Sequence, residues 1–228
     1  MKILIINPNS SPTMTANIQN AALQYAAGRF EVETLPTPGA PEFIDTFEDR
    51  ALAAPGMMEL VRSHQDQVDA FVVACHCDPN LQLMRELTDK PVVGIGEASF
   101  YLASMLGDSF SVLSTGIYSN PNKVNLIRSY HMQDHLASVV VAQDGPDEVS
   151  RYIAAGRKAM EEDGAEVIIL GCAGLCQLAQ QVEQALGVPV LDGVACGLAV
   201  AEGMVYAGMH TSKFRYYSAG KPQERKES

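Results

Sequence analysis

Two cysteines each stand at the end of a short apolar run. Cys75 follows Phe71 to Ala74 in the stretch FVVACHCDPN, and Cys172 follows Val167 to Leu170 and one glycine. A thiolate is an easily desolvated base, and each thiol carries a single proton. Two thiols on opposite sides of a carbon atom can therefore remove a proton from one face and deliver one to the other. The pair indicates a site that inverts a carbon centre.

The sequence after each cysteine predicts the start of a helix. Asp78 and Pro79 are residue types typical of the N-cap and first helical positions, and a second helix is expected from Leu175. The amino end of a helix lowers the pKa of a nearby thiol from its ordinary value of about 8.5, and its free N–H groups can stabilise an enolate. We therefore expect both thiols to ionise readily.

Other interpretations of the cysteines remain open. Cysteines at strand ends are often simply buried. A zinc site could draw on Cys75, His76, Cys77, Cys172 and Cys176, but the C-x-C and C-x-x-x-C spacings do not match those of zinc knuckles. No metal site is predicted. The remaining cysteines are interpreted as bystanders of the reaction: Cys77, Cys176 and Cys196.

Short apolar strands alternate with helical segments along the whole chain. Strands are expected over residues 2–6, 30–35, 68–75, 91–94, 110–113, 137–142, 167–171 and 188–191. Helices are expected over residues 13–27, 47–67, 78–88, 96–106, 118–130, 147–163, 175–186 and 193–207. This alternation is typical of an α/β protein with parallel sheets.

The two cysteine segments also indicate an internal duplication. Pro91 stands 16 positions after Cys75, Pro189 stands 17 positions after Cys172, and each proline opens the next short strand. We predict two pseudo-symmetric α/β lobes, the first formed by residues 1–97 with 193–228 and the second by residues 98–192. Ligands bind at the carboxyl ends of parallel strands, so the active site is expected in the cleft between the lobes.

Polar residues follow the first strand of each predicted lobe. The segment Asn7 to Ser11 and the pair Ser114–Thr115 are placed to converge on a small polar ligand, although capping of the next helix explains each of them equally well. The segment GIGE at residues 94–97 lacks the third glycine of a dinucleotide fingerprint. No cofactor site is therefore predicted.

Composition excludes several classes of function. The chain has 27 acidic and 16 basic side chains, a net charge of −11, and its basic residues gather only in the last nine positions, which argues against nucleic acid as a partner. No signal peptide and no apolar run of roughly 18 residues are present, so we expect a cytoplasmic protein without a membrane partner. Five cysteines and no export signal predict free thiols.

Several motifs together resemble those of one enzyme family. They are INPNSSPTMT, GAPEFIDTFEDRALAAPGMMELV, ACHCDPNL, PVVGIGEAS, VLSTGIYSNP, ILGCAGL and PVLDGVACG, and they run through nearly the whole chain. The sequence resembles the aspartate/glutamate/hydantoin racemase superfamily, and within it the hydantoin and allantoin racemases. The resemblance implies an isomerase that needs neither cofactor nor metal, acts on a small molecule and forms homo-oligomers.

The resemblance also implies roles for individual residues. Cys75 and Cys172 would be the catalytic acid/base pair, and Ile44 would contact the substituent at the stereocentre. The other residues that would line the substrate pocket are Asn9, His76, Ser114, Thr115, Ala173 and Gly174. The substrate implied is a 5-substituted hydantoin, allantoin or a related cyclic ureide.

The chain departs from its relatives in the first cysteine motif. The common hydantoin-branch pattern has an aromatic residue, then Ser or Asp, then D-P-G, whereas this chain has His76, Cys77 and then D-P-N. The resembled amino-acid racemases hold the substrate carboxylate with Asn and Thr side chains, and these are replaced here by His76–Cys77 and Ala173–Gly174. Open alternatives are an amino-acid racemase, a maleate-type isomerase, a decarboxylase and a non-catalytic ligand- or metal-binding protein.

Overall fold

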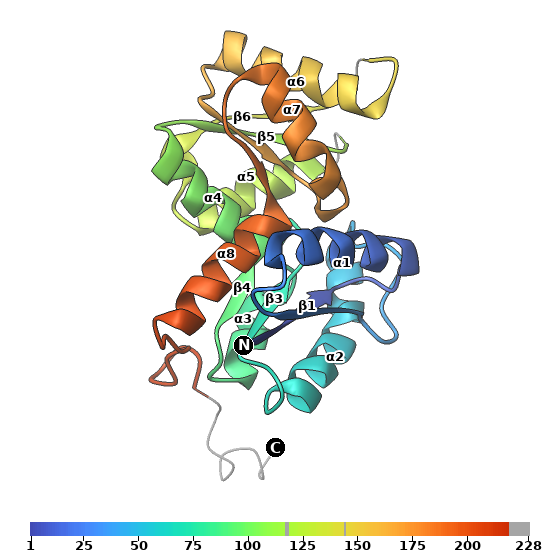
Figure 1. Cartoon of the computed structure of the whole chain (residues 1–228), viewed down its shortest axis with the longest axis vertical. Coiled ribbons are helices and arrows are strands. Elements are labelled where there is room, and N and C mark those ends of the chain that lie inside the picture. The colour runs from blue at the N-terminus through green and yellow to red at the C-terminus, as the bar shows by residue number, and fades with distance from the viewer. Residues whose placement is uncertain (117–118, 144, 219–228) are drawn as a thin grey trace.

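The computed structural model describes residues 1–116, 119–143 and 145–218. The described chain forms two parallel four-stranded sheets with helices on both faces of each, which lie one above the other in Figure 1. The strands of the first sheet are β1 (Lys2–Asn7), β2 (Glu31–Pro36), β3 (Ala70–Val73) and β4 (Val92–Gly94). Those of the second are β5 (Phe110–Ser114), β6 (Leu136–Val141), β7 (Val167–Leu170) and β8 (Val190–Asp192).

The two sheets have the same strand order. The first runs β2-β1-β3-β4 and the second β6-β5-β7-β8, so that β3 and β7 occupy equivalent central positions. Both of these strands are completely buried, because they have a neighbour on each side and helices above and below. This explains their continuous apolar sequences, AFVV and VIIL. The predicted fold class, with two pseudo-symmetric parallel lobes, is confirmed.

Helices cover both faces of each sheet. Those of the first half are α1 (Pro12–Ala26), α2 (Phe47–His64), α3 (Leu81–Leu87) and α4 (Ile95–Leu106). Those of the second half are α5 (Asn120–Ser129), α6 (Glu148–Asp163), α7 (Ala179–Leu186) and α8 (Gly193–Tyr206), with short 3₁₀ turns η2 (Gln133–His135) and η3 (Ala173–Leu178). The expected start of the fifth helix at residue 118 lies outside the described residues.

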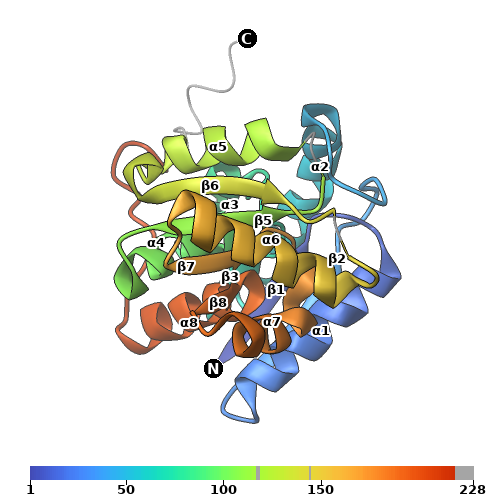
Figure 2. The same cartoon turned by 90° about the horizontal axis from the view of Figure 1, so that it is seen from above.

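Helices α4 and α8 connect the two lobes. Apolar residues of α8, among them Val194 and Leu198, join the core between the first sheet and α1, whereas Phe100 and Ala103 of α4 join a core on the second sheet. The two helices also pack against each other, and Figure 2 shows the lobes from above with α8 beside α1. At Gly197 a Cβ atom would lie 3.0 Å from both Ile95 and Val72, so glycine permits this close approach.

The predicted division at residues 97 and 98 falls inside the continuous helix α4. The division places residues 193–206, which form α8, in the first lobe, and α8 packs on the sheet of that lobe. We keep the division, residues 1–97 with 193–228 and residues 98–192, as a proposal. Over the described residues, no helix is both long enough and apolar enough to cross a membrane.

Two predicted helix starts are wrong. The helix expected from Asp78 begins at Leu81, because Asp78 and Asn80 both have a positive φ that interrupts a helix. The carboxylate of Asp78 caps α4 instead, and it accepts hydrogen bonds from Gly96 N (2.9 Å) and Glu97 N (2.7 Å). The helix expected from Leu175 begins at Ala179, after the 3₁₀ turn η3.

Candidate active site

Cys75 and Cys172 line one cavity of about 210 Å³ between the lobes. Each follows the buried central strand of its sheet, β3 or β7, and the parallel register brings the carboxyl ends of those strands to the cleft. The other residues that line the cavity are Asn9, Met14, Phe43, Ile44, Asp45, Arg50, Ala74, His76, Cys77, Thr115, Ser119, Asn122, Lys123, Gly171 and Ala173. Two thiols from equivalent strands thus open on the same space.

Cys75 is in contact with a second cysteine of the cavity, because its sulfur lies 3.3 Å from that of Cys77. One thiol of this pair donates a hydrogen bond to the other. The contact raises the pKa of Cys75 well above its ordinary value, with burial as a second cause, and it lowers the pKa of Cys77. Cys77, predicted to be a bystander, therefore lines the cavity and shares a proton with Cys75.

Cys172 sits directly before the 3₁₀ turn η3. Burial raises the pKa of its thiol, and the backbone N–H of Gly174 opposes that change by donating to the sulfur. The remaining two cysteines lie outside the cavity lining: Cys176 Sγ faces the carbonyl oxygen of Asn17 at 3.8 Å, and Cys196 is buried in α8. Burial raises the pKa of both to about 12.

The prediction that helix ends lower the pKa of both thiols, Cys75 and Cys172, is wrong. Asp78 and Asn80 have a positive φ, and α3 begins only at Leu81, six positions after Cys75. At Cys172 the N–H of Gly174 acts in the predicted direction, but burial outweighs it. Both thiols therefore hold their protons more tightly than a free cysteine.

Asp78 fastens the cysteine loop to both lobes. Besides the two N–H groups of α4, its carboxylate accepts a hydrogen bond of 2.9 Å from the hydroxyl of Tyr130, which follows α5. Burial raises the pKa of Asp78 to about 6. A cavity-lining segment of the first lobe is thus anchored on residues of the second.

Some of the predicted binding residues line the cavity, and others do not. Asn9, Ile44, His76, Thr115 and Ala173 line the cavity. The Asn9 side chain accepts hydrogen bonds from Asn7 Nδ2 (2.8 Å) and Ser11 N (3.0 Å), which fixes its orientation. Ser114 and Gly174 are not among the lining residues.

Those two residues support the wall of the cavity. The hydroxyl of Ser114 hydrogen-bonds to that of Ser119 and donates to the carbonyl oxygen of Gly116 (3.1 Å), so it orders the turn that presents Thr115 and Ser119. Gly174 donates its N–H to Cys172, as described above.

The imidazole of His76 is buried, with 2% of the residue exposed, and packs edge-on against Phe100 at 5.3 Å between ring centroids. Neither ring nitrogen has a hydrogen-bond partner in the described structure. Burial lowers the pKa of His76 well below its ordinary value, and the nearby charge of Lys123 lowers it further. His76 is therefore a neutral aromatic residue of the lobe junction.

Sequence reasoning missed two cationic residues of the cavity, Lys123 and Arg50. Lys123 was detectable in principle, because it shares a helical face with the buried Ile127 and stands on the apolar side of α5. Its Nζ donates a hydrogen bond of 2.6 Å to the carbonyl oxygen of Gly171. Arg50 lies on α2, where its guanidinium stacks over Phe47, and nothing in its spacing marks it.

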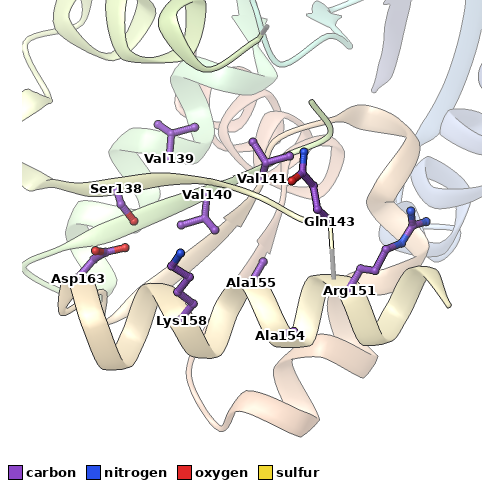
Figure 3. A pocket seen from close by; sticks show the side chains of 10 residues that line it. All are labelled: Ser138, Val139, Val140, Val141, Gln143, Arg151, Ala154, Ala155, Lys158 and Asp163. Carbon is purple, nitrogen blue, oxygen red and sulfur yellow. The ribbon is translucent and has the colours of Figure 1, made fainter. Parts of the chain in front are cut away.

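Two other observations limit the location and chemistry of the site. Within the described part of the chain, no three His, Cys, Asp or Glu side chains are grouped so that they could hold a metal ion. A second hollow of about 440 Å³ lies between β6 and α6, where Figure 3 shows Arg151, Lys158 and Asp163 on the helix and Ser138 on the strand. Neither cysteine nor histidine is among the described residues that line it.

Comparisons with known proteins identify the family of this chain. The family model Asp/Glu/Hydantoin racemase matches residues 3–201. A hydantoin racemase from Pseudomonas sp. (strain NS671) is 40% identical over 233 residues, which cover 98% of this chain and 94% of the relative. The enzyme class predicted from the sequence, an isomerase, is confirmed by such relatives.

Two solved structures resemble the chain over nearly its full length. An allantoin racemase from Klebsiella pneumoniae has a TM-score of 0.89 and 34% identity, and the match covers 95% of this chain and 92% of that one. An allantoin racemase from Pseudomonas fluorescens has a TM-score of 0.90 and 32% identity, with 97% and 98% covered. With the family model spanning residues 3–201, the chain belongs to the Asp/Glu/hydantoin racemase family.

Proposed function

We propose that this chain is a cofactor-independent racemase of a 5-substituted hydantoin, allantoin or a related cyclic ureide. One observation carries the proposal: Cys75 and Cys172 follow equivalent strands of two matching sheets and line the same cavity. The similarity to hydantoin and allantoin racemases supports this substrate class.

The proposed reaction uses the two thiols in turn. A thiolate on one side takes the proton from C5, and the electron pair moves onto the adjacent carbonyl oxygen to give an enolate. The thiol on the other side then donates its proton to the opposite face of C5, and it becomes the thiolate that starts the reverse reaction. Each step transfers one proton, so the negative charge passes from one sulfur to the substrate and on to the second sulfur.

The cavity suits a small polar ring. Its volume of about 210 Å³ is below the range of roughly 300–1,000 Å³ usual for drug-sized ligands. We propose that Asn9 and Thr115 bind the polar edge of the ring and that Ile44 contacts the C5 substituent. His76 and Ala173 would contribute backbone groups, and Ser114 and Gly174 would act through their neighbours.

A racemisation assay with single-enantiomer substrates tests the proposal. The panel contains allantoin, several 5-substituted hydantoins and free amino acids, the last because Arg50 and Asp45 also line the cavity. Loss of optical rotation is followed for the wild type, Cys75→Ser and Cys172→Ser, and corrected for the rate without enzyme. Cys196→Ser, in a buried cysteine outside the cavity lining, is the matched control.

We expect at least one cyclic ureide to racemise, each cavity cysteine variant to lose about 10²–10⁴-fold in rate, and Cys196→Ser to keep it. Racemisation of free amino acids but of no cyclic ureide would indicate that the chain is an amino-acid racemase. Dependence on only one of the two cysteines would favour a decarboxylase or a maleate-type isomerase. No turnover of any ureide would refute the proposal.

A further inference from the structure

Lys123 places a charged group at the centre of the cavity wall. Only 6% of the residue is exposed, and it lines the same cavity as Cys75, Cys77 and Cys172. Its ammonium donates 2.6 Å to the carbonyl oxygen of Gly171, the residue before Cys172. Among the described residues, no carboxylate lies within ion-pair distance of it, so the hydrogen bond to Gly171 is not accompanied by a compensating negative charge.

A buried ammonium without a counter-ion is unfavourable, and a protein usually either neutralises or pairs such a group. Burial accordingly lowers the pKa of Lys123. The acidic groups that face it are the thiols of Cys172, Cys75 and Cys77 and the carboxyl of Asp78, and their negative charges act in the opposite direction.

The thiols are the partners that remain available. Asp78 already accepts two N–H groups of α4 and the hydroxyl of Tyr130. The other charged groups around the thiols are Arg50, which acts on Cys77, and Asp45, which acts on Cys172, while His76 stays neutral. The charge of Lys123 lowers the pKa of all three cavity thiols.

We propose that Lys123 is a positioning residue whose ammonium is the counter-charge for a single thiolate in the cavity. The hydrogen bond to Gly171 holds the ammonium beside the second cysteine, while the same group borders the cysteine pair of the first lobe. Its use in turnover rests on the proposed function: the negative charge that passes from one sulfur through the enolate to the other stays close to one cation throughout.

The test measures thiolate formation in the free protein, without substrate. Ultraviolet absorbance of thiolate is followed against pH, and alkylation of individual cysteines by iodoacetamide is followed by peptide mass spectrometry. The variants are Lys123→Met, which removes the charge at similar length, and Lys123→Arg, which keeps it. Lys158→Met, in an exposed lysine of α6, is the matched control, and Cys176 and Cys196 are internal references.

An opposite charge at close range lowers a pKa by about 1–3 units, so in Lys123→Met the midpoint of thiolate formation should rise by at least about one pH unit. Alkylation of the cavity thiols near neutral pH should fall by about tenfold or more, with Lys123→Arg close to the wild type. Unchanged midpoints in Lys123→Met, or equal losses in Lys123→Arg, would overturn the proposal.

A second measurement covers the case in which Lys123→Met does not fold. In wild-type protein with labelled lysine side chains, the Nζ resonance of Lys123 should shift at the pH at which thiolates appear, and a resonance that does not move there would also overturn the proposal. Because no substrate is present, failure here leaves the proposed racemase activity untouched. Failure of the racemisation assay likewise leaves the thiolate result standing.

Discussion

Replacing Asp78 by alanine should both destabilise the protein and disturb the cysteine loop. The change leaves Gly96 N, Glu97 N and the hydroxyl of Tyr130 without their acceptor in a buried place. Hydrogen bonds to a charged group contribute about 1.5–3 kcal/mol each. The rise in the pKa of Asp78 from 3.8 to about 6 is a net shift: burial disfavours the ionised form by about 3 kcal/mol more than these hydrogen bonds favour it. Because alanine leaves three buried donors unpaired but also removes this buried charge, we expect a net loss of roughly 2–5 kcal/mol near neutral pH.

The pH dependence of this loss has a definite sign. The pKa of Asp78 is higher in the folded protein than in the unfolded chain, so the stability linked to its protonation is fully present below about 3.8 and is lost as the pH rises through about 6. Between about pH 5 and 7.5 the wild type should lose about 1.4 kcal/mol from this group, and Asp78→Ala should not. The difference between the two proteins is therefore larger at the lower pH.

Urea unfolding followed by circular dichroism at both pH values measures these quantities. Asp147→Ala is the matched control, because Asp147 caps α6 at the surface through Ser150 N (2.8 Å) and its replacement should destabilise the protein less. A loss in Asp78→Ala no larger than in Asp147→Ala would refute the buried-anchor account. So would a difference from the wild type that shrinks at the lower pH.

Two further predictions concern the neighbours of Cys75. Cys77→Ser removes the neighbouring sulfur that raises the pKa of Cys75, so alkylation of Cys75 near pH 8 should become about threefold faster or more, and slower alkylation would contradict the shared proton. His76→Phe keeps a buried aromatic ring but cannot take a proton. Folding lowers the pKa of His76, so the free energy of unfolding of the wild type should fall by about 1.4 kcal/mol between about pH 7.5 and 5.5, whereas that of the variant should not. Urea unfolding at both pH values measures the two losses, and equal losses would count against a buried neutral His76.

Most of the fold follows from local patterns in the sequence. Continuous apolar runs such as VIIL at 167–170 fit buried central strands, and their alternation with helices indicates parallel sheets. The helix start at Asp78 was mispredicted because N-cap chemistry does not specify which helix a side chain will cap, and the start at Leu175 because the 3₁₀ turn η3 precedes α7. The Asp78 carboxylate caps the amino end of α4, where Gly96 stands 18 positions further along the chain, and tertiary packing brings the two together.

The site was harder to predict than the fold. Cys75 and Cys172 could be identified because each follows a buried strand, and strand ends meet at one edge of a parallel sheet. Lys123 was missed because its importance depends on a contact between distant segments: its Nζ donates to the carbonyl oxygen of Gly171, 48 positions away. Cys77 was missed because the short contact of its sulfur with that of Cys75, two positions before it, depends on the local conformation of the chain. The direction of the thiol pKa shifts was also missed, since burial cannot be weighed against a helix end before the cavity is known.

The isotope content of early products tests the two-cysteine mechanism most directly. A single enantiomer of a racemised hydantoin is incubated with the wild-type protein in deuterium oxide, and both enantiomers are separated at low conversion and analysed by mass spectrometry. If Cys75 and Cys172 act on opposite faces, the product should carry deuterium at C5, while the recovered starting enantiomer keeps its proton. Deuterium at the same level in both enantiomers would indicate one base serving both faces and would contradict the account.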